Sequence, residues 1–268
     1  MLYLDSGQTL QLLQISDTHL SEQADAHLLG INTQQSLQAV LAMMAAEQHD
    51  PAAILVTGDL SQDDSLASYC YLQQALTRFT CPAFWLNGNH DNAAAMQQVA
   101  ANTPALQQVV RSTYWQVILL NSQVEGAVLG YLDAMQLQLL DQALQQRPDL
   151  HTLICLHHHP VPMGSAWIDN IGLQNADALT AVIASYPQVR AVLWGHVHQE
   201  SDRSINGVRY LSSPSTCVQF LPCSADFAVD QLAPGYRWLN LHADGSIDTG
   251  VSRVAAGVFT ADLAAGGY

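Results

Sequence analysis

Five short blocks of the sequence hold side chains of the kinds that bind metal ions, and each block follows an apolar run typical of a β-strand. Carboxylate, amide and imidazole groups without nearby thiolates suit a hard or borderline divalent metal that keeps one position open for chemistry. The sequence therefore points to metal-assisted hydrolysis and not to a structural zinc site. The residues in the five blocks are Asp17 with His19, Asp59, Asn89 with His90 and Asp91, His157 with His158 and His159, and His196 with His198.

The local spacing in these blocks suits a shared site. Aspartate and histidine, or two histidines, stand two residues apart in the first and last blocks, so an extended chain can present both side chains to one face. Glycine stands directly before Asp59, Asn89 and His196. Because glycine permits tight turns, we expect the backbone to pass close to the site at these three positions.

Composition narrows the class of protein. The chain has 268 residues, a mass of 29.1 kDa and 49% hydrophobic residues, which predicts one large compact domain. The net charge is −15, with eight arginines and no lysine, which argues against a nucleic-acid partner and excludes a P-loop lysine or a lysine Schiff base. Five cysteines without a Cys-x-x-Cys pair indicate neither a disulfide framework nor a thiolate zinc site.

The first residues and the apolar runs of the chain predict where in the cell the protein is located. The first residues, Met1 to Ser6, carry no basic region typical of a signal peptide, and the longest apolar runs are too short to span a bilayer. We therefore expect a cytoplasmic protein with no membrane partner.

Strand and helix patterns alternate along the chain, which predicts a layered α/β fold. The first half is expected to form strands at 10–15, 52–56 and 83–86, with helices at 33–48 and 63–78. The second half repeats the alternation, with strands at 115–121, 152–156 and 191–194 and helices at 133–146 and 175–186. After Glu200, turn signals at Asn206-Gly207 and Asp244-Gly245 predict antiparallel hairpins.

Taken in order, the motifs D-x-H, G-D, G-N-H-D, a strand-ending histidine and G-H-x-H resemble the signature of the calcineurin-like dinuclear metallophosphoesterases, over residues 17–198. Stretches at 29–33, 156–160 and 213–220 are similar to the bacterial 3′,5′-cyclic AMP phosphodiesterase branch of that family. The resemblance implies a β-sandwich of two mixed sheets flanked by α-helices. We expect a single domain over 1–254 and a C-terminal tail at 255–268.

The resemblance implies two divalent metal ions, iron or manganese, with zinc as an alternative. One ion would be held by Asp17, His19 and His198, and the other by Asn89, His157 and His196. Asp59 would bridge them. Two such ions with two carboxylates and a bridging hydroxide retain about one positive charge, which would attract an anionic phosphodiester.

The remaining roles follow from the same resemblance. His90 is the expected catalytic residue, which hydrogen-bonds the phosphoryl group and protonates the departing ribose oxygen. Asp91 and Asp63 are both candidates to orient it. The expected substrate-binding residues are His19, Asp59, Asn89, His90 and His198.

The implied function is hydrolysis of 3′,5′-cyclic AMP to 5′-AMP through a metal-bridging hydroxide. The alternatives are a phosphodiesterase of the same superfamily that acts on 2′,3′-cyclic nucleotides or glycerophosphodiesters, and a non-catalytic regulator that binds cyclic nucleotides. The implied partner is the cyclic nucleotide substrate, and the protein is expected to be a monomer or a homodimer.

Some residues of the blocks also have simpler interpretations. Asp17 and Asp59 are candidates for helix caps, and Asn89 for a turn residue. Alternation places His157 and His159 on one face of the chain and His158 on the other, so the choice of His157 as a ligand comes from the family pattern.

Several residues outside the predicted ligand set also have more than one interpretation or a simple one. Trp167 is either a wall of the substrate pocket, where adenine would stack, or a buried loop aromatic. The histidines outside the blocks are expected to be ordinary polar residues: His27, His49, His151 and His242.

Overall fold

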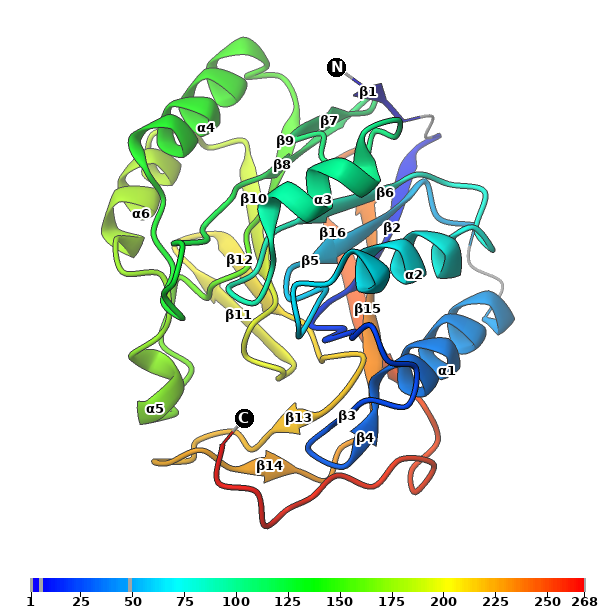
Figure 1. The fold of residues 1–268 in the computed structure, drawn as a ribbon. Coiled ribbons are helices and arrows are strands. Elements are labelled where there is room, and N and C mark those ends of the chain that lie inside the picture. The colour runs from blue at the N-terminus through cyan, green and yellow to red at the C-terminus, as the bar shows by residue number, and fades with distance from the viewer. Residues whose placement is uncertain (1, 5–6, 48–49, 268) are drawn as a thin grey trace.

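Two β-sheets lie face to face at the centre of the protein (Figure 1). The computed structural model describes residues 2–4, 7–47 and 50–267. His49 and the expected last residue of the first helix, Gln48, lie outside these ranges. The larger sheet contains, in spatial order, β1 (Leu2–Tyr3), β7 (Val109–Arg111), β8 (Trp115–Leu119), β9 (His151–Cys155), β10 (Val189–Trp194), β12 (Val208–Ser212) and β11 (Ser201–Ile205). The smaller sheet contains β16 (Ile247–Arg253), β15 (Gly235–His242), β2 (Thr9–Ile15), β5 (Ala53–Thr57) and β6 (Ala83–Leu86).

Both sheets are mixed. Strands β8, β9, β10 and β12 run parallel, whereas β11 pairs antiparallel with β12. Strands β2, β5 and β6 run parallel, and β15 pairs antiparallel with β2 and with β16. The hairpins β11–β12 and β15–β16 turn at the two predicted dipeptides. The predicted α/β sandwich of two mixed sheets is confirmed.

Helices cover the outer faces of the sandwich (Figure 1). Helices α4 (Ala134–Gln146) and α6 (Ala176–Ala184) pack on the larger sheet, and α1 (Thr33–Ala46), α2 (Leu66–Leu76) and α3 (Ala93–Ala100) pack on the smaller one. In β5, Leu55 faces the inter-sheet core, whereas Ile54 and Val56 face the helices. This alternation explains why the strands read as continuous apolar runs, because both of their faces are buried.

Apolar side chains from both sheets pack in the layer between them. Leu12 and Leu55 of the smaller sheet meet Val117, Leu153 and Leu193 of the larger sheet, and each is exposed by 2% or less. Burying one such side chain contributes about 1.5–3 kcal/mol of transfer free energy. This core fixes the two sheets relative to each other and therefore fixes the loops at their ends.

Several short elements were not predicted from the sequence. Helix α3 spans eight residues and is capped by Asn92, whose side chain accepts a hydrogen bond from the backbone of Ala95. Short segments show little periodicity, so their pattern is weak. The others are β3 (His27–Leu28), β4 (Ile31–Asn32), α5 (Ala166–Asp169), β13 (Gln219–Phe220) and β14 (Val229–Asp230), besides β1 and β7.

The described part of the C-terminal segment contacts the rest of the protein. The backbone N–H of Asp262 donates to the carbonyl of Leu29 at 2.8 Å. Phe259, Ala261 and Ala265 pack against the core cluster that α4 and α6 form with the larger sheet. The division into one domain and a tail stays a prediction. Among the described residues, no helix is both long enough and apolar enough to cross a membrane.

Candidate metal centre

All seven predicted metal ligands lie just beyond the carboxyl ends of strands. Because β2, β5 and β6 are parallel in one sheet and β9 and β10 are parallel in the other, these ends meet at one end of the sandwich. Asp17 and His19 follow β2, Asp59 follows β5, Asn89 follows β6, His157 follows β9, and His196 and His198 follow β10.

Two buried carboxylates lie among the buried imidazoles. The Asp59 Oδ2 atom lies 3.2 Å from His157 Nε2 and 3.8 Å from His19 Nε2. The Asp17 Oδ1 atom lies 3.5 Å from His198 Nε2. All five side chains are 1% exposed or less.

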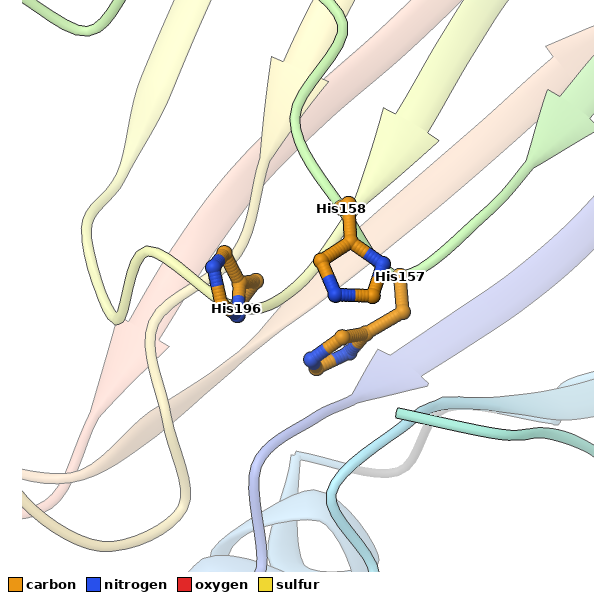
Figure 2. Close-up of side chains that lie close together, drawn as sticks. All are labelled: His157, His158 and His196. Atoms are coloured by element: carbon orange, nitrogen blue, oxygen red, sulfur yellow. The ribbon is translucent and has the colours of Figure 1, made fainter. Parts of the chain in front are cut away.

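The other two predicted ligands join this cluster. The Asn89 Oδ1 atom lies 3.2 Å from His157 Nε2, and the side chain of Asn89 is half-buried. His196 comes from the loop after β10, and the centroid of its ring lies 5.0 Å from that of His157 and 4.7 Å from that of His158 (Figure 2). The structure thus brings the seven residues together, including one group, Asp17, His19 and His198, whose donor atoms lie within 4.8 Å of one another.

Five of the seven residues have a left-handed backbone, which is unusual for residues other than glycine. Such conformations cost roughly 1–3 kcal/mol each and persist only where the surroundings impose them. Here the surroundings are hydrogen bonds between loops: the backbone N–H of His19 donates to the Asp59 carbonyl at 2.9 Å, and that of His196 donates to Asp17 Oδ1 at 3.0 Å. The values of φ are 54° at Asp17, 44° at His19, 51° at Asp59, 65° at His196 and 48° at His198.

The glycines before the ligands allow a close approach between loops, as the sequence predicts. A Cβ atom on Gly195 would lie 2.0 Å from Ser16 Oγ and 2.8 Å from Asp17 Oδ2. A Cβ atom on Gly88 would lie 2.2 Å from Asp59 Oδ1. Both positions exclude any side chain.

The first prediction concerns Gly195. Replacing it with alanine forces the Asp17 loop away from the His196 loop, and such overpacking typically costs about 1–3 kcal/mol of the free energy of unfolding. Urea denaturation measures this loss. Gly266→Ala is the matched control, because a Cβ atom there has no neighbour within 4 Å. Equal stability of the two variants would contradict the close approach.

Backbone carbonyls orient two of the histidines. His157 Nδ1 lies 2.8 Å from the carbonyl oxygen of Thr57, and His198 Nδ1 lies 2.8 Å from that of Val218. Since a carbonyl only accepts, each Nδ1 carries a proton, and each Nε2 is left to face the cluster. The ring of His198 also stacks on Phe220 at 4.1 Å between centroids.

At four residues of the cluster, electrostatics favour charged carboxylates and neutral imidazoles. Burial works to raise the pKa of Asp17 and that of Asp59, but His198 and His157, respectively, outweigh it and lower both pKa values. Burial lowers the pKa of His19 to about 3 and that of His196 well below its usual range. These are the protonation states that a metal ligand requires.

His157 differs from the other histidines of the cluster. Burial works to lower its pKa, but the Asp59 carboxylate outweighs this effect and raises the pKa to about 9. A divalent cation bound at Asp59 would take the place of this positive charge.

The surroundings of two buried atoms indicate whether metal ions fit into the cluster. Asp59 Oδ2 and His196 Nε2 are buried, and neither makes a hydrogen bond with any of the residues that the structure describes. A buried polar group left unsatisfied costs about 1–3 kcal/mol, and a bound cation would satisfy both atoms. Oxygen and imidazole donors suit iron, manganese or zinc. The residues therefore fit the two divalent ions that the sequence predicts.

His90 lies between the cluster and an open cavity. Its backbone N–H donates to Asp59 Oδ1 at 2.9 Å, and its half-buried ring meets that of His19 edge-on at 5.1 Å. The cavity has a volume of about 570 Å³, and Gln62, Asn89 and His90 are among the residues that line it. An imidazole in this position can reach a molecule in the cavity.

Asp91 connects two loops of the site, a role that the sequence does not reveal. Its carboxylate accepts hydrogen bonds from the backbone of Leu60, Ser61 and Gly88 and from the hydroxyl of Tyr69, at 2.8–3.2 Å. Burial, followed by the charge of Asp59, raises its pKa to about 7.

Asp63 has a comparable structural role. It accepts hydrogen bonds from the backbone of Glu22 and Ser65. Both Asp91 and Asp63 therefore hold the loops of the site in place, and the orientation of His90 by one of them stays a prediction.

The second and third histidines of the triple block lie close to the cluster. His158 Nδ1 lies 2.8 Å from Ser122 Oγ, and its Nε2 lies 3.1 Å from the carbonyl of Val128. Both nitrogens of His158 are thus engaged by the 122–128 loop. The ring of His159 stacks on that of His196 at 5.7 Å.

Trp167 belongs to an aromatic cluster. It lies in α5 and meets Phe220 and Phe227 edge-on at 5.3 Å and 5.2 Å between ring centroids. Trp167 is half-buried and belongs to a short helix, not to a loop, which corrects the expectation of a buried loop aromatic. Stacking of adenine on Trp167 stays a prediction. The cavity beside His90 is lined by other residues.

Known proteins are similar to this chain in sequence. The chain is 48% identical over 257 residues to the 3′,5′-cyclic adenosine monophosphate phosphodiesterase CpdA of Pseudomonas aeruginosa, with 96% of this chain and 94% of that protein covered. It is 46% identical to the protein of the same name from Escherichia coli (strain K12), covering 97% and 95%.

A solved structure shares the fold at low sequence identity. A dimetal phosphatase from Danio rerio matches with a TM-score of 0.62 and 14% identity, covering 91% of this chain and 99% of that one. The family model for calcineurin-like phosphoesterases matches residues 10–200, which contain all seven predicted ligands. By sequence, fold and arrangement of the site, the chain belongs to the calcineurin-like phosphoesterase family.

Proposed function

We propose that the protein is a cytoplasmic, metal-dependent phosphodiesterase that hydrolyses 3′,5′-cyclic AMP to 5′-AMP. The observation that carries the proposal is the cluster of seven potential metal ligands beside the cavity that His90 lines. Similarity over nearly the whole length of relatives named as 3′,5′-cyclic AMP phosphodiesterases supports the choice of substrate.

The proposed site would hold two divalent ions. Asp17, His19 and His198 would bind one ion, Asn89, His157 and His196 would bind the other, and Asp59 would bind both. Iron or manganese is the proposed metal, with zinc as the alternative. Two ions held in this way would supply Lewis-acid polarisation of the phosphoryl oxygens and activation of the attacking water.

The protein itself contributes orientation and a proton. His90 lies at the border between the cluster and the cavity, where its imidazole can hydrogen-bond the phosphoryl group and protonate the departing O3′ atom of the ribose. Asn89 reaches both His157 and the cavity, so it would contact the phosphoryl group together with His90. The proposed substrate-binding residues are His19, Asp59, Asn89, His90 and His198, of which Asn89 and His90 line the cavity.

Turnover of four diesters tests this proposal. Protein loaded with Mn²⁺ or Fe²⁺ is assayed with 3′,5′-cyclic AMP, 3′,5′-cyclic GMP, 2′,3′-cyclic AMP and a glycerophosphodiester, beside an Asn89→Ala variant. The expected result is preferential conversion of 3′,5′-cyclic AMP to 5′-AMP that requires metal and is lost in the variant. Faster turnover of another diester would overturn the substrate, and no turnover with either metal would overturn the enzymatic function.

A further inference from the structure

Gln62 contacts both the ligand cluster and the cavity beside His90, although it belongs to none of the five sequence blocks. Its side-chain oxygen Oε1 lies 2.6 Å from His19 Nδ1. The half-buried side chain also lines the cavity together with Asn89 and His90. Gln62 is therefore placed to act on a metal ligand and on a substrate.

The contact with Gln62 determines which nitrogen of His19 faces the cluster. An amide oxygen only accepts hydrogen bonds, so Nδ1 of His19 must carry the ring proton and Nε2 must carry the lone pair. That Nε2 atom lies 3.2 Å from His198 Nε2 and 3.8 Å from Asp59 Oδ2, inside the cluster. The lone pair therefore points to where a metal ligand is needed.

His19 differs from the other two oriented histidines in the kind of partner. His157 and His198 donate to backbone carbonyls, which no substitution removes. The partner of His19 is a side chain. Of these three histidines, only His19 can therefore lose its Nδ1 partner through a single side-chain substitution. That substitution leaves all seven proposed ligands in place.

The backbone around Gln62 is held firmly. The backbone N–H of Gln62 donates to the carbonyl of Leu20 at 2.7 Å, and that of Leu20 donates to Leu60 at 3.0 Å. The backbone N–H of Ser61 donates to the buried Asp91 carboxylate at 3.1 Å. The segments that carry His19 and Gln62 thus extend β2 and β5 side by side, which gives the side chain of Gln62 a fixed origin.

The side-chain amide of Gln62 also carries an NH2 group, which can donate hydrogen bonds. Because Oε1 is committed to His19, the NH2 group points away from that ring, and the side chain borders the cavity. We propose that Gln62 is a positioning residue, which holds His19 as a metal ligand through Oε1 and donates to a bound phosphodiester through its NH2 group. This inference rests on the proposed function.

Two substitutions separate the two roles. Gln62→Met removes both the acceptor and the donor, whereas Gln62→Glu keeps an acceptor for His19 and loses the donor. Protein stripped of metal by a chelator is titrated with MnCl2 in a calorimeter. We expect Gln62→Met to bind one of the two ions about 10–100-fold more weakly, and Gln62→Glu to restore binding, because a carboxylate also orients a ligating histidine.

Kinetics test the second role. The reloaded Gln62→Glu variant is expected to show a raised KM for the phosphodiester with a smaller change in kcat, because a carboxylate cannot donate to the substrate and repels its charge. Gln138→Met, on the exposed face of α4, is the matched control and should match the wild type in both measurements. Circular dichroism establishes that all variants are folded.

The outcomes distinguish the inference from the function on which it rests. Wild-type Mn²⁺ affinity in Gln62→Met would overturn the positioning role, and an unchanged KM in Gln62→Glu would overturn the donor role. If Gln62→Met failed to fold, weakened binding in Gln62→Glu would overturn the positioning role instead. Wild-type protein that binds no Mn²⁺ would overturn the metal site itself and the role of Gln62 with it.

Discussion

Replacing Asp59 with asparagine is expected to lower kcat/KM by more than about 100-fold and to remove bound metal. The loss of a single partner that orients a metal ligand typically costs 10–100-fold in affinity or activity, so a ligand shared by both proposed ions should cost more. The change is nearly isosteric. Its Oδ1 atom can still accept the hydrogen bond from His90, so the loop keeps its anchor.

The reason for this large effect lies at Oδ2. That atom is buried, makes no hydrogen bond within the described part of the chain, and lies 3.2 Å from His157 Nε2 and 3.8 Å from His19 Nε2. In asparagine an NH2 group takes its place or exchanges with Oδ1, and neither arrangement supplies the negative charge of the carboxylate. The substitution removes one negative charge that would attract both cations, so it would weaken both proposed metal sites at once.

Metal content and turnover are measured on the same preparations of Asp59→Asn. The matched control is Asp226→Asn, an exposed aspartate outside the strands and helices, which should match the wild type. If Asp59→Asn kept two ions and full activity, Asp59 would not bridge them. If it lost activity but kept both ions, its role would lie in the chemistry of the substrate and not in binding metal.

The strands and the ligand blocks could be predicted from the sequence for one physical reason. Each block follows an apolar run, and parallel strands in a sheet end at the same edge. The predicted strands 52–56 and 191–194 overlap β5 (Ala53–Thr57) and β10 (Val189–Trp194). Gly58-Asp59 and Gly195-His196 follow these strands, so the sequence indicates both the strands and the meeting of the ligands.

The partners that orient the ligands could not be predicted in the same way. The carbonyl that holds His198 belongs to Val218, 20 residues later in the chain, and the bonds of Asp91 reach back about 30 residues to Leu60 and Ser61. These contacts depend on how loops return to the site, which local periodicity does not encode. The left-handed backbone at Asp59 and His196 likewise arises from loop-to-loop hydrogen bonds.

The roles of metal ligand and proton donor are expected to separate in the His90→Ala variant. This variant should bind the same number of ions as the wild type, because His90 is not among the seven proposed ligands. Its kcat for 3′,5′-cyclic AMP should fall about 10²–10⁴-fold, the usual contribution of general acid catalysis. The ring that is removed borders both the His19 imidazole and the cavity.

The leaving group decides whether His90 acts as an acid. Ribose O3′ is a poor leaving group that needs a proton, whereas p-nitrophenolate leaves as a stable anion. The loss in His90→Ala should therefore be much smaller for bis(p-nitrophenyl) phosphate than for 3′,5′-cyclic AMP. Exposed His27, in β3, provides the matched control His27→Ala, which should retain wild-type kcat on both substrates. An equal loss on both substrates would assign His90 to binding the phosphoryl group, and full turnover with bound metal would exclude it from catalysis.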